Sequence, residues 1–136
     1  MKDANCYLSV GVWAEVEEAV VGDNLASRWG SGSLDVYATP AMIALMEAAG
    51  VEAVDAKLPD GWITVGISVD VRHLAATPPG SRVRARAELV EVDGCRLVFA
   101  VSAWDHREKI GEGMHQRYCV ERASFAQRAQ GKVDVR

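Results

Sequence analysis

The sequence predicts an α+β domain in which one antiparallel sheet curls around a single long helix. Two observations predict it: residues 40–57 form one long apolar segment with helix signals, and several segments of alternating apolar and polar residues are joined by short turns. The chain has 136 residues, of which 49% are hydrophobic and 25% charged, as expected for one globular domain. We therefore expect a single domain over residues 1–136, with its core at about 10–122 and a polar, frayed tail at 123–136.

The helix signals begin at Thr39 and Pro40. A threonine hydroxyl can cap the first turn of a helix, and proline suits the first helical position because its φ is already helical and it lacks an N–H. We predict a helix from Pro40 to about Lys57, apolar over most of its circumference and therefore buried. Its apolar stripe consists of Met42, Ile43, Met46, Ala49, Gly50, Ala53 and Val54, widened by Leu45 and Ala48. The small residues at 48–50 should let a sheet approach the helix closely.

The predicted strands lie on both sides of this helix. Residues 14–21 form a first strand, and a glycine-rich loop follows at 29–33. After the turn at 59–61, residues 63–72 alternate with the odd-numbered positions apolar, so we expect that face to be buried. Residues 82–89 and 95–103 pair through the hairpin dipeptide Asp93-Gly94, and residues 110–121 supply the last strand. One sheet around one helix leaves a free edge, which favours pairing with a second copy.

Composition limits the classes of partner. The formal net charge of −4 argues against a broad nucleic-acid surface, and no apolar run approaches the roughly 18 residues typical of a membrane-spanning helix. Cys6, Cys95 and Cys119 are odd in number, lack metal-type spacing and follow no secretory leader. We therefore expect a cytoplasmic protein with reduced thiols, no metal or cofactor, and neither nucleic acid nor membrane as a partner.

Glu47 and His73 are the residues whose surroundings best suit chemistry. Glu47 is the only charged residue between Asp35 and Glu52, on a helix with apolar surroundings, where an unpaired carboxyl group would have a raised pKa and could act as a base or nucleophile. The alternative is a glutamate at the rim of the helix that faces water or pairs with an arginine. His73 continues the register of the following strand toward the helix, and its alternative is a core histidine bonded to a backbone carbonyl.

Two further residues have structural as well as functional interpretations. Thr39 is first of all a helix cap, worth about 1 kcal/mol, and catalysis would be an added role. Gly66 could present a backbone N–H to a developing oxyanion, although a glycine in a strand more often marks a bulge or close packing. The helix start, the middle of the helix and the end of the next strand could meet where a sheet wraps a helix.

The order and spacing of several stretches resemble the fluoroacetyl-CoA thioesterase-like branch of the hotdog superfamily. Together they span the chain from Tyr37 to Arg117. They are Tyr37-Ala38-Thr39-Pro40-Ala41-Met42, Leu45-Met46-Glu47, Val65-Gly66, His73-Leu74-Ala75-Ala76-Thr77-Pro78-Pro79-Gly80, and Ile110-Gly111 with Gly113, His115 and Arg117.

The resemblance implies a hotdog fold, thioesterase activity, and a dimer with active sites at or near the subunit interface. By position, the residues that match the family's catalytic set are Thr39, Glu47 and His73, and those that match substrate contacts are Gly66 and Arg117. His115 has a weaker, structural match.

The chain departs from the family pattern just before the threonine. The family's fluoroacetyl-specific enzyme has an aromatic-rich segment there, whereas this chain has Gly30-Ser31-Gly32-Ser33. We therefore expect a thioesterase for a small acyl- or aryl-thioester, with acyl-CoA or an acyl-carrier thioester as substrate, acting as a homodimer or tetramer.

Two other functions stay open at this stage. A hotdog enoyl-CoA hydratase or dehydratase would use an aspartate and a histidine close together on one segment, and Gly22-Asp23-Asn24 lacks the proline and histidine that usually follow. A non-catalytic acyl-CoA-binding module is the other, because a fold does not fix a function. Turnover of an enoyl-CoA without thiol release would favour the first, and saturable binding without hydrolysis the second.

Overall fold

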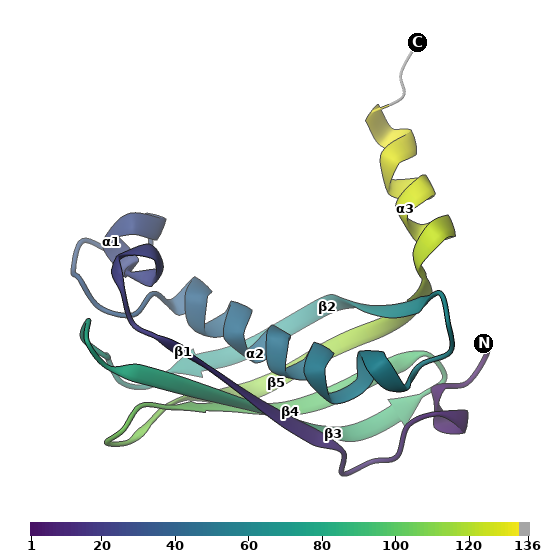
Figure 1. Cartoon of the computed structure of the whole chain (residues 1–136), viewed down its shortest axis with the longest axis horizontal. Helices are drawn as coiled ribbons and strands as arrows, with labels where there is room; N and C mark the ends of the chain where they lie inside the picture. Colours follow the sequence, from purple (N-terminus) through teal and green to yellow (C-terminus); the bar gives the residue numbers. More distant parts are fainter. Residues whose placement is uncertain (134–136) are drawn as a thin grey trace.

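The computed structural model describes residues 1–133, which form a five-stranded antiparallel sheet with one long helix across its concave face (Figure 1). The sheet order is β1-β3-β4-β5-β2. The strands are β1 (Trp13–Ala19), β2 (Trp62–His73), β3 (Arg82–Asp93), β4 (Arg96–Trp104) and β5 (Lys109–Glu121), and the helices are α1 (Ala26–Trp29), α2 (Thr39–Val54) and α3 (Arg122–Gln130). Short 3-10 turns lie at η1 (Ala4–Cys6), η2 (Gly22–Asn24), η3 (Asp55–Lys57) and η4 (Gly131–Val133). The predicted α+β hotdog architecture is confirmed.

The long helix α2 differs from the prediction at both ends. Its N-cap is Ala38, without a side-chain capping bond, and Thr39 lies in the first turn with its hydroxyl directed elsewhere. The capping role predicted for Thr39 is therefore wrong, because His73 takes the hydroxyl that a cap would need. At the other end the α-helix stops at Val54, and the remainder to Lys57 is the 3-10 turn η3.

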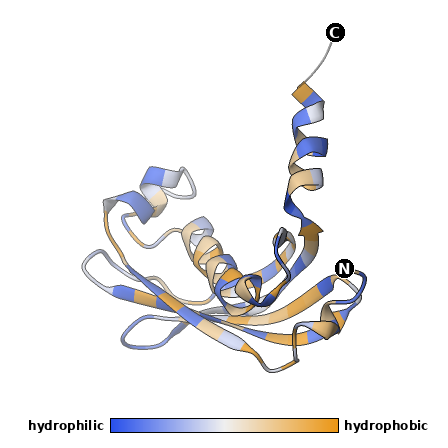
Figure 2. Ribbon diagram, turned by 45° about the vertical axis from the view of Figure 1, so that its right-hand side comes forward, coloured by the Kyte–Doolittle hydropathy of each residue, from blue (hydrophilic) through white to orange (hydrophobic). Residues whose placement is uncertain are grey.

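The core lies between α2 and the sheet, where Figure 2 shows hydrophobic residues on the helix and on the strands beneath it. Close approach depends on missing side chains at two glycines. A Cβ on Gly50 would lie 3.3 Å from Cδ of Arg117, and one on Gly111 of β5 would overlap the thioether of Met42. The prediction that small residues let the sheet approach the helix is confirmed at Gly50, whereas Ala48 is exposed.

The edge strand β2 changes register in its middle, which overturns the expected burial of its odd-numbered face. A bulge between Gly66 and Ser68 inserts an extra residue, so Thr64 and Gly66 face α2 before the bulge and His73 faces it afterwards. Ile67 and Val69, expected in the core, are 52% and 39% exposed. The result is a free strand edge with apolar side chains beside it.

The C-terminal residues form the helix α3 where we expected a frayed tail. Three alanines in a nine-residue segment favour helix, and the backbone N–H of Arg122 donates to the carbonyl of Gly61 at 2.8 Å. Figure 1 shows α3 pointing away from the sheet, and none of its residues is buried. The last part of the predicted tail, residues 134–136, lies outside the described residues. None of the helices within residues 1–133 is long and apolar enough to cross a membrane.

Candidate active site

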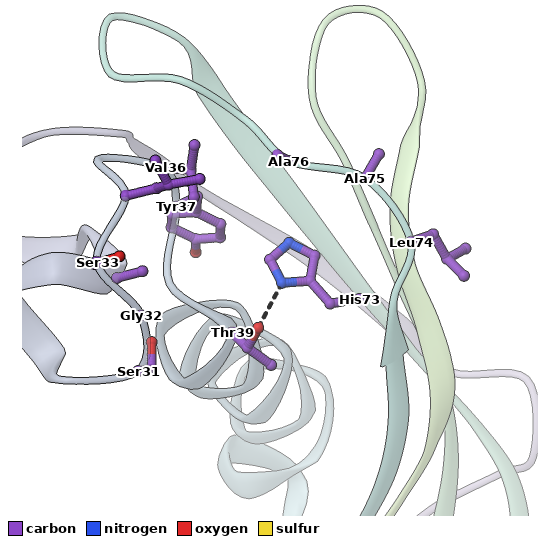
Figure 3. A pocket seen from close by; sticks show the side chains of 12 residues that line it. Ser31, Gly32, Ser33, Val36, Tyr37, Thr39, His73, Leu74, Ala75 and Ala76 are labelled. Atoms are coloured by element: carbon purple, nitrogen blue, oxygen red, sulfur yellow. Dashed lines mark hydrogen bonds between the residues drawn. The ribbon is translucent and has the colours of Figure 1, made fainter.

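A cavity of about 460 Å³ lies at the N-terminal end of α2. Its walls come from the loop at residues 31–34, from Val36 and Tyr37 just before the helix, and from residues 73–76 at the end of β2 (Figure 3). The predicted glycine-rich loop therefore forms one wall, and it contributes serine and glycine where an aromatic ring would fill space. The opposite wall carries Thr39 and His73.

Thr39 and His73 form a hydrogen-bonded pair in this cavity. Oγ1 of Thr39 lies 2.7 Å from Nδ1 of His73. Figure 3 marks this bond with a dashed line. The other ring nitrogen, Nε2, is buried and has no hydrogen-bond partner among the described residues. Burial lowers the pKa of His73, and the backbone of Ala75 opposes this shift, so the ring is neutral near pH 7. A neutral imidazole with an unpartnered nitrogen at a cavity wall is suited to bind a polar group of a ligand.

Glu47 lies two turns further along α2, in a second cluster. Eight residues separate it from Thr39, which is about 12 Å along a helix axis. Its carboxylate Oε2 lies 3.7 Å from Nη1 of Arg117 on β5, and a Cβ on Gly66 would be only 2.6 Å from the same oxygen. The side chain of Glu47 is 40% exposed, so it is half-buried and paired with an arginine, which is the second of the two environments considered from the sequence.

Arg117 makes two hydrogen bonds to Thr64, a residue that the sequence did not single out. Its Nε donates to Oγ1 of Thr64 at 2.7 Å, and its Nη2 donates to the carbonyl of the same residue at 3.0 Å. The hydroxyl of Thr64 in turn donates to Oδ1 of Asp55 at 2.5 Å. Arg117 is 5% exposed, and burial lowers its pKa, whereas the carboxylates of Asp55 and Glu47 raise it.

His115 has a defined tautomer. Its Nε2 lies 3.1 Å from Nη1 of Arg117, and because a guanidinium only donates, Nε2 accepts. Nδ1 lies 2.8 Å from the carbonyl of Ser68, which only accepts, so Nδ1 carries the proton. Burial is the main cause that lowers the pKa of His115, and the charge of Arg117 adds to it. The ring is therefore neutral and fully hydrogen-bonded.

The predicted site residues thus fall into two groups. Thr39 and His73 meet at the cavity, while Glu47, Gly66 and Arg117 meet in the middle of α2. Within one chain Glu47 does not contact His73. Sequence reasoning missed Thr64 and Asp55, and the signal for Thr64 was a threonine in the even-numbered register of a strand whose odd-numbered face was expected to be buried.

Comparison with known proteins identifies relatives over most of the chain. The family model described as fluoroacetyl-CoA-specific thioesterase matches residues 20–123. A fluoroacetyl-CoA thioesterase from Streptantibioticus cattleyicolor is 41% identical over 99 residues, which cover 73% of this chain and 71% of that protein.

Solved structures agree with this relationship. A structure of a fluoroacetyl-CoA thioesterase superposes with a TM-score of 0.86 at 32% identity, covering 93% of this chain and 98% of the other. A hot-dog-like protein from Thermanaerovibrio acidaminovorans superposes with a TM-score of 0.88 at 25% identity, covering 98% of each chain. A thioesterase superfamily member from Thermus thermophilus gives 0.83 at 28% identity, with 93% and 96% covered.

Proposed function

The chain belongs to the fluoroacetyl-CoA-specific thioesterase family, and from that premise we propose that it uses Thr39, Glu47 and His73 to hydrolyse a small acyl- or aryl-thioester of coenzyme A. It is an acyl-CoA thioester hydrolase of the hotdog fold. The observation that carries the site assignment is the bond between Thr39 and His73 at the wall of the cavity, which leaves Nε2 of His73 for the substrate.

The cavity supports the proposed size of the acyl group. Its volume of about 460 Å³ admits a short acyl chain or a single aromatic ring, and its loop wall at residues 31–34 carries no aromatic side chain. A fluoroacetyl group would leave much of such a space unfilled. We therefore propose general small-acyl or aryl-acyl specificity, with coenzyme A or an acyl carrier as the thiol.

The chemistry requires a nucleophile and stabilisation of the oxyanion. A thiol leaving group has a pKa near 8.5, judging from cysteine, so it needs little acid assistance. In one route Glu47 takes a proton from water, the water oxygen bonds to the carbonyl carbon, and the C–S bond breaks to release a thiolate, which takes the proton back from Glu47. In the other route a carboxylate oxygen of Glu47 displaces the thiol and forms an anhydride that water then cleaves. If hydroxylamine traps the anhydride, the second route operates. If no anhydride is trapped, the first route operates.

His73 and Thr39 act at the carbonyl oxygen or at the attacking water. If the hydroxyl of Thr39 donates to Nδ1, Nε2 carries a proton that can stabilise the oxyanion; if Nδ1 donates, Nε2 can accept a proton. In either tautomer, Nε2 is the ring nitrogen that we assign to the reacting groups. Gly66 offers its backbone N–H beside Glu47 as a second donor to the oxyanion.

We propose that two copies pair so that Glu47 of one copy completes the cavity of the other. The separation of about 12 Å along α2 between Thr39 and Glu47 supports a shared site. The free edge of β2, with Ile67 52% exposed and Val69 39% exposed beside it, supports this strand as the dimer contact. Two such dimers could associate further into a tetramer. The unpaired thiols of Cys6, Cys95 and Cys119 support a cytoplasmic location.

The test of activity is thiol release from a panel that runs from acetyl-CoA and fluoroacetyl-CoA to butyryl-CoA and benzoyl-CoA. We expect Glu47→Gln and His73→Ala each to lower kcat/KM by about 100-fold or more. Glu52→Gln, an exposed position on the same helix, is the matched control and should leave the rate unchanged. Wild-type rates in folded Glu47→Gln and His73→Ala would overturn the site assignment.

Mixed dimers test the shared site. When inactive His73→Ala and Glu47→Gln chains are unfolded together and refolded, half of the dimers are mixed, and one of their two sites holds both intact residues. We expect activity to recover to about a quarter of the wild-type level. A site contained within one copy would give no recovery.

A further inference from the structure

We infer that Arg117 is a positioning residue for the carboxylate of Glu47, and that Asp55, Thr64 and His115 fix its guanidinium in place. This inference rests on the proposed function, because it gives Arg117 a role that acts through Glu47. Its basis is a chain of hydrogen bonds, half-buried at Asp55 and buried beyond it, that starts at the end of α2, crosses β2 and ends on β5.

The guanidinium of Arg117 is already engaged at each of its nitrogens. Nε and Nη2 bind the hydroxyl and carbonyl of Thr64, while Nη1 binds His115 and faces Glu47. Only 6% of the side chain is exposed. These hydrogen bonds fix the plane of the guanidinium, and Nη1 lies 3.7 Å from Oε2 of Glu47.

The first support comes from α2 through Thr64. Because the backbone N–H and the hydroxyl of Thr64 both donate to the carboxylate of Asp55, at 3.3 and 2.5 Å, the hydroxyl oxygen is left to accept from Nε of Arg117. The direction of each hydrogen bond is therefore fixed: Arg117 donates to Thr64, and Thr64 donates to Asp55. Asp55 stands at the C-terminal end of α2, so the chain ties that end of the helix to the guanidinium.

The second support comes from His115 and Gly50. Neutral His115 has one acceptor, Nε2, which points at Nη1, and its Nδ1–H is held by the carbonyl of Ser68 beside the bulge of β2. The stem of Arg117 packs against Gly50 of α2, where a Cβ would lie 3.3 Å from Cδ. The guanidinium can neither rotate about Nε nor retreat without breaking one of these contacts.

The consequence falls on Glu47. Its Oε2 lies 3.7 Å from Nη1 of Arg117 and 2.6 Å from the position that a Cβ on Gly66 would occupy, so the charge of Arg117 attracts it into space that Gly66 leaves open. A misplacement of about 1 Å in a reacting group can cost on the order of 100-fold in rate. The hydrogen bonds that Arg117 donates to Thr64 and His115 therefore fix the carboxylate of Glu47 at the place where it reacts.

The experiment compares Thr64→Val with Thr64→Ser in hydrolysis of the best substrate found for the wild type. Valine keeps the shape of threonine but removes the hydroxyl that joins Asp55 to Arg117, and serine keeps the hydroxyl. We expect Thr64→Val to lower kcat by about 10-fold or more with KM within about twofold, and Thr64→Ser to restore most of kcat. Asp55→Asn, which weakens the same chain one bond earlier, should lower kcat by a smaller factor.

A matched control separates positioning from loss of stability. Thr77 is buried and its hydroxyl bonds Oδ2 of Asp105 at 2.9 Å, so Thr77→Val breaks the same kind of bond away from Glu47. We expect Thr64→Val and Thr77→Val to lower Tm similarly while Thr64→Val alone lowers kcat at a temperature where both are folded. Side-chain ¹⁵N NMR provides a readout without substrate: the slowly exchanging Nε–H signal of Arg117 should be present in the wild type and in Thr64→Ser and lost in Thr64→Val.

The outcomes distinguish this inference from the proposed function. If the wild type hydrolyses no acyl-CoA in the panel, the proposed function fails, and the positioning role fails with it. If the wild type is active and Thr64→Val has the kcat of Thr64→Ser, only the positioning role is overturned. If Thr64→Val does not fold, Asp55→Asn decides by the same criterion: a normal kcat overturns the inference, and a reduced kcat with normal KM supports it.

Discussion

The cluster at the start of α2 and the cluster in its middle use polar groups in opposite ways. At the start, His73 has one bond to Thr39 and one buried nitrogen without a partner among the described residues, and both side chains line a cavity. In the middle of α2, both ring nitrogens of His115 and all three nitrogens of the Arg117 guanidinium form hydrogen bonds within the chain. The first cluster has an unpartnered ring nitrogen, whereas in the second cluster Glu47 is the half-exposed group and Arg117 and His115 are held by partners within the chain.

This difference indicates that the two clusters have different roles: the first binds a ligand, and the second fixes the position of a side chain. A buried polar group without a partner costs free energy, and such a cost persists where a ligand is to be bound. A saturated network fixes geometry and adds little affinity. Glu47 connects the two, because it is anchored to the saturated cluster and is still 40% exposed. The comparison predicts that changes in the middle cluster affect stability and kcat, whereas changes at the cavity affect chemistry with little loss of stability.

Arg117→Met should give the largest loss of stability. Removing the guanidinium leaves the buried hydroxyl and carbonyl of Thr64 and Nε2 of His115 without their donor, which should cost about 3 kcal/mol in the free energy of unfolding. His73→Ala, at the cavity, should cost about 1 kcal/mol or less because it removes a single hydrogen bond. Urea unfolding of both variants measures this contrast, and equal losses would contradict the division between the clusters.

Gly66→Ala should give the next largest effect, this time on rate. A Cβ at this position would lie 2.6 Å from Oε2 of Glu47, so the carboxylate has to move. We expect kcat to fall by about 10- to 100-fold with a loss of stability near 1 kcal/mol. The control is Gly131→Ala, where a Cβ meets nothing within 4 Å and no left-handed φ is required. Normal kcat in Gly66→Ala would show that the position of Glu47 does not limit the reaction.

The sequence predicted the fold better than the contacts of the site, and two residues explain why. Alternation and turn dipeptides locate strands such as β3 and β4 because burial of one face depends only on local periodicity. The bulge at Ile67 has no such local signal, since it depends on how β2 pairs with β5, and it reverses which residues face the helix. His73 was placed correctly because it follows the bulge, and Thr64 was missed because it precedes it.

The resemblance to a family identified residues but not their spatial grouping. Thr39 and Glu47 lie on one helix, and their separation follows from helix geometry alone, about 12 Å for eight residues. A motif records which residues recur, not which side chains touch within one chain. Pairing with an arginine is the less reactive of the two environments that the sequence allows for Glu47, and the structure identifies that arginine as Arg117, which other residues hold in place.

Thr39→Val should change the rate moderately. It removes the hydroxyl that holds Nδ1 of His73 but keeps the shape of the side chain, and it leaves the middle cluster untouched. We expect kcat to fall by about 10-fold and the free energy of unfolding to change by less than about 1 kcal/mol, with Thr39→Ser close to the wild type in both. A large loss of stability in Thr39→Val would indicate a structural role for the pair. Steady-state kinetics and thermal unfolding of the same samples measure both quantities.

The smallest expected effect is a dependence of stability on pH. Burial lowers the pKa values of His73 and His115 in the folded chain, so below about pH 6.5 the unfolded chain binds protons first and stability falls. Above that pH both histidines are neutral in either state, and their contribution is fully present. Each can contribute at most about 1.4 kcal/mol per pH unit to the slope.

His115→Gln sharpens this comparison between the clusters. Glutamine supplies one donor and one acceptor without titrating, and the charged groups that face His115 are Arg117 on β5 and Glu47 on α2. Urea unfolding between pH 5 and 7.5 gives the free energy of unfolding as a function of pH. We expect this free energy to change less with pH in His115→Gln than in the wild type, and least when His73→Ala is added. Because protonated His115 would place a proton between Nε2 and the guanidinium of Arg117, kcat of the wild type should also fall more steeply toward low pH than kcat of His115→Gln. Parallel pH profiles in the two proteins would show that the tautomer of His115 does not control the position of Glu47.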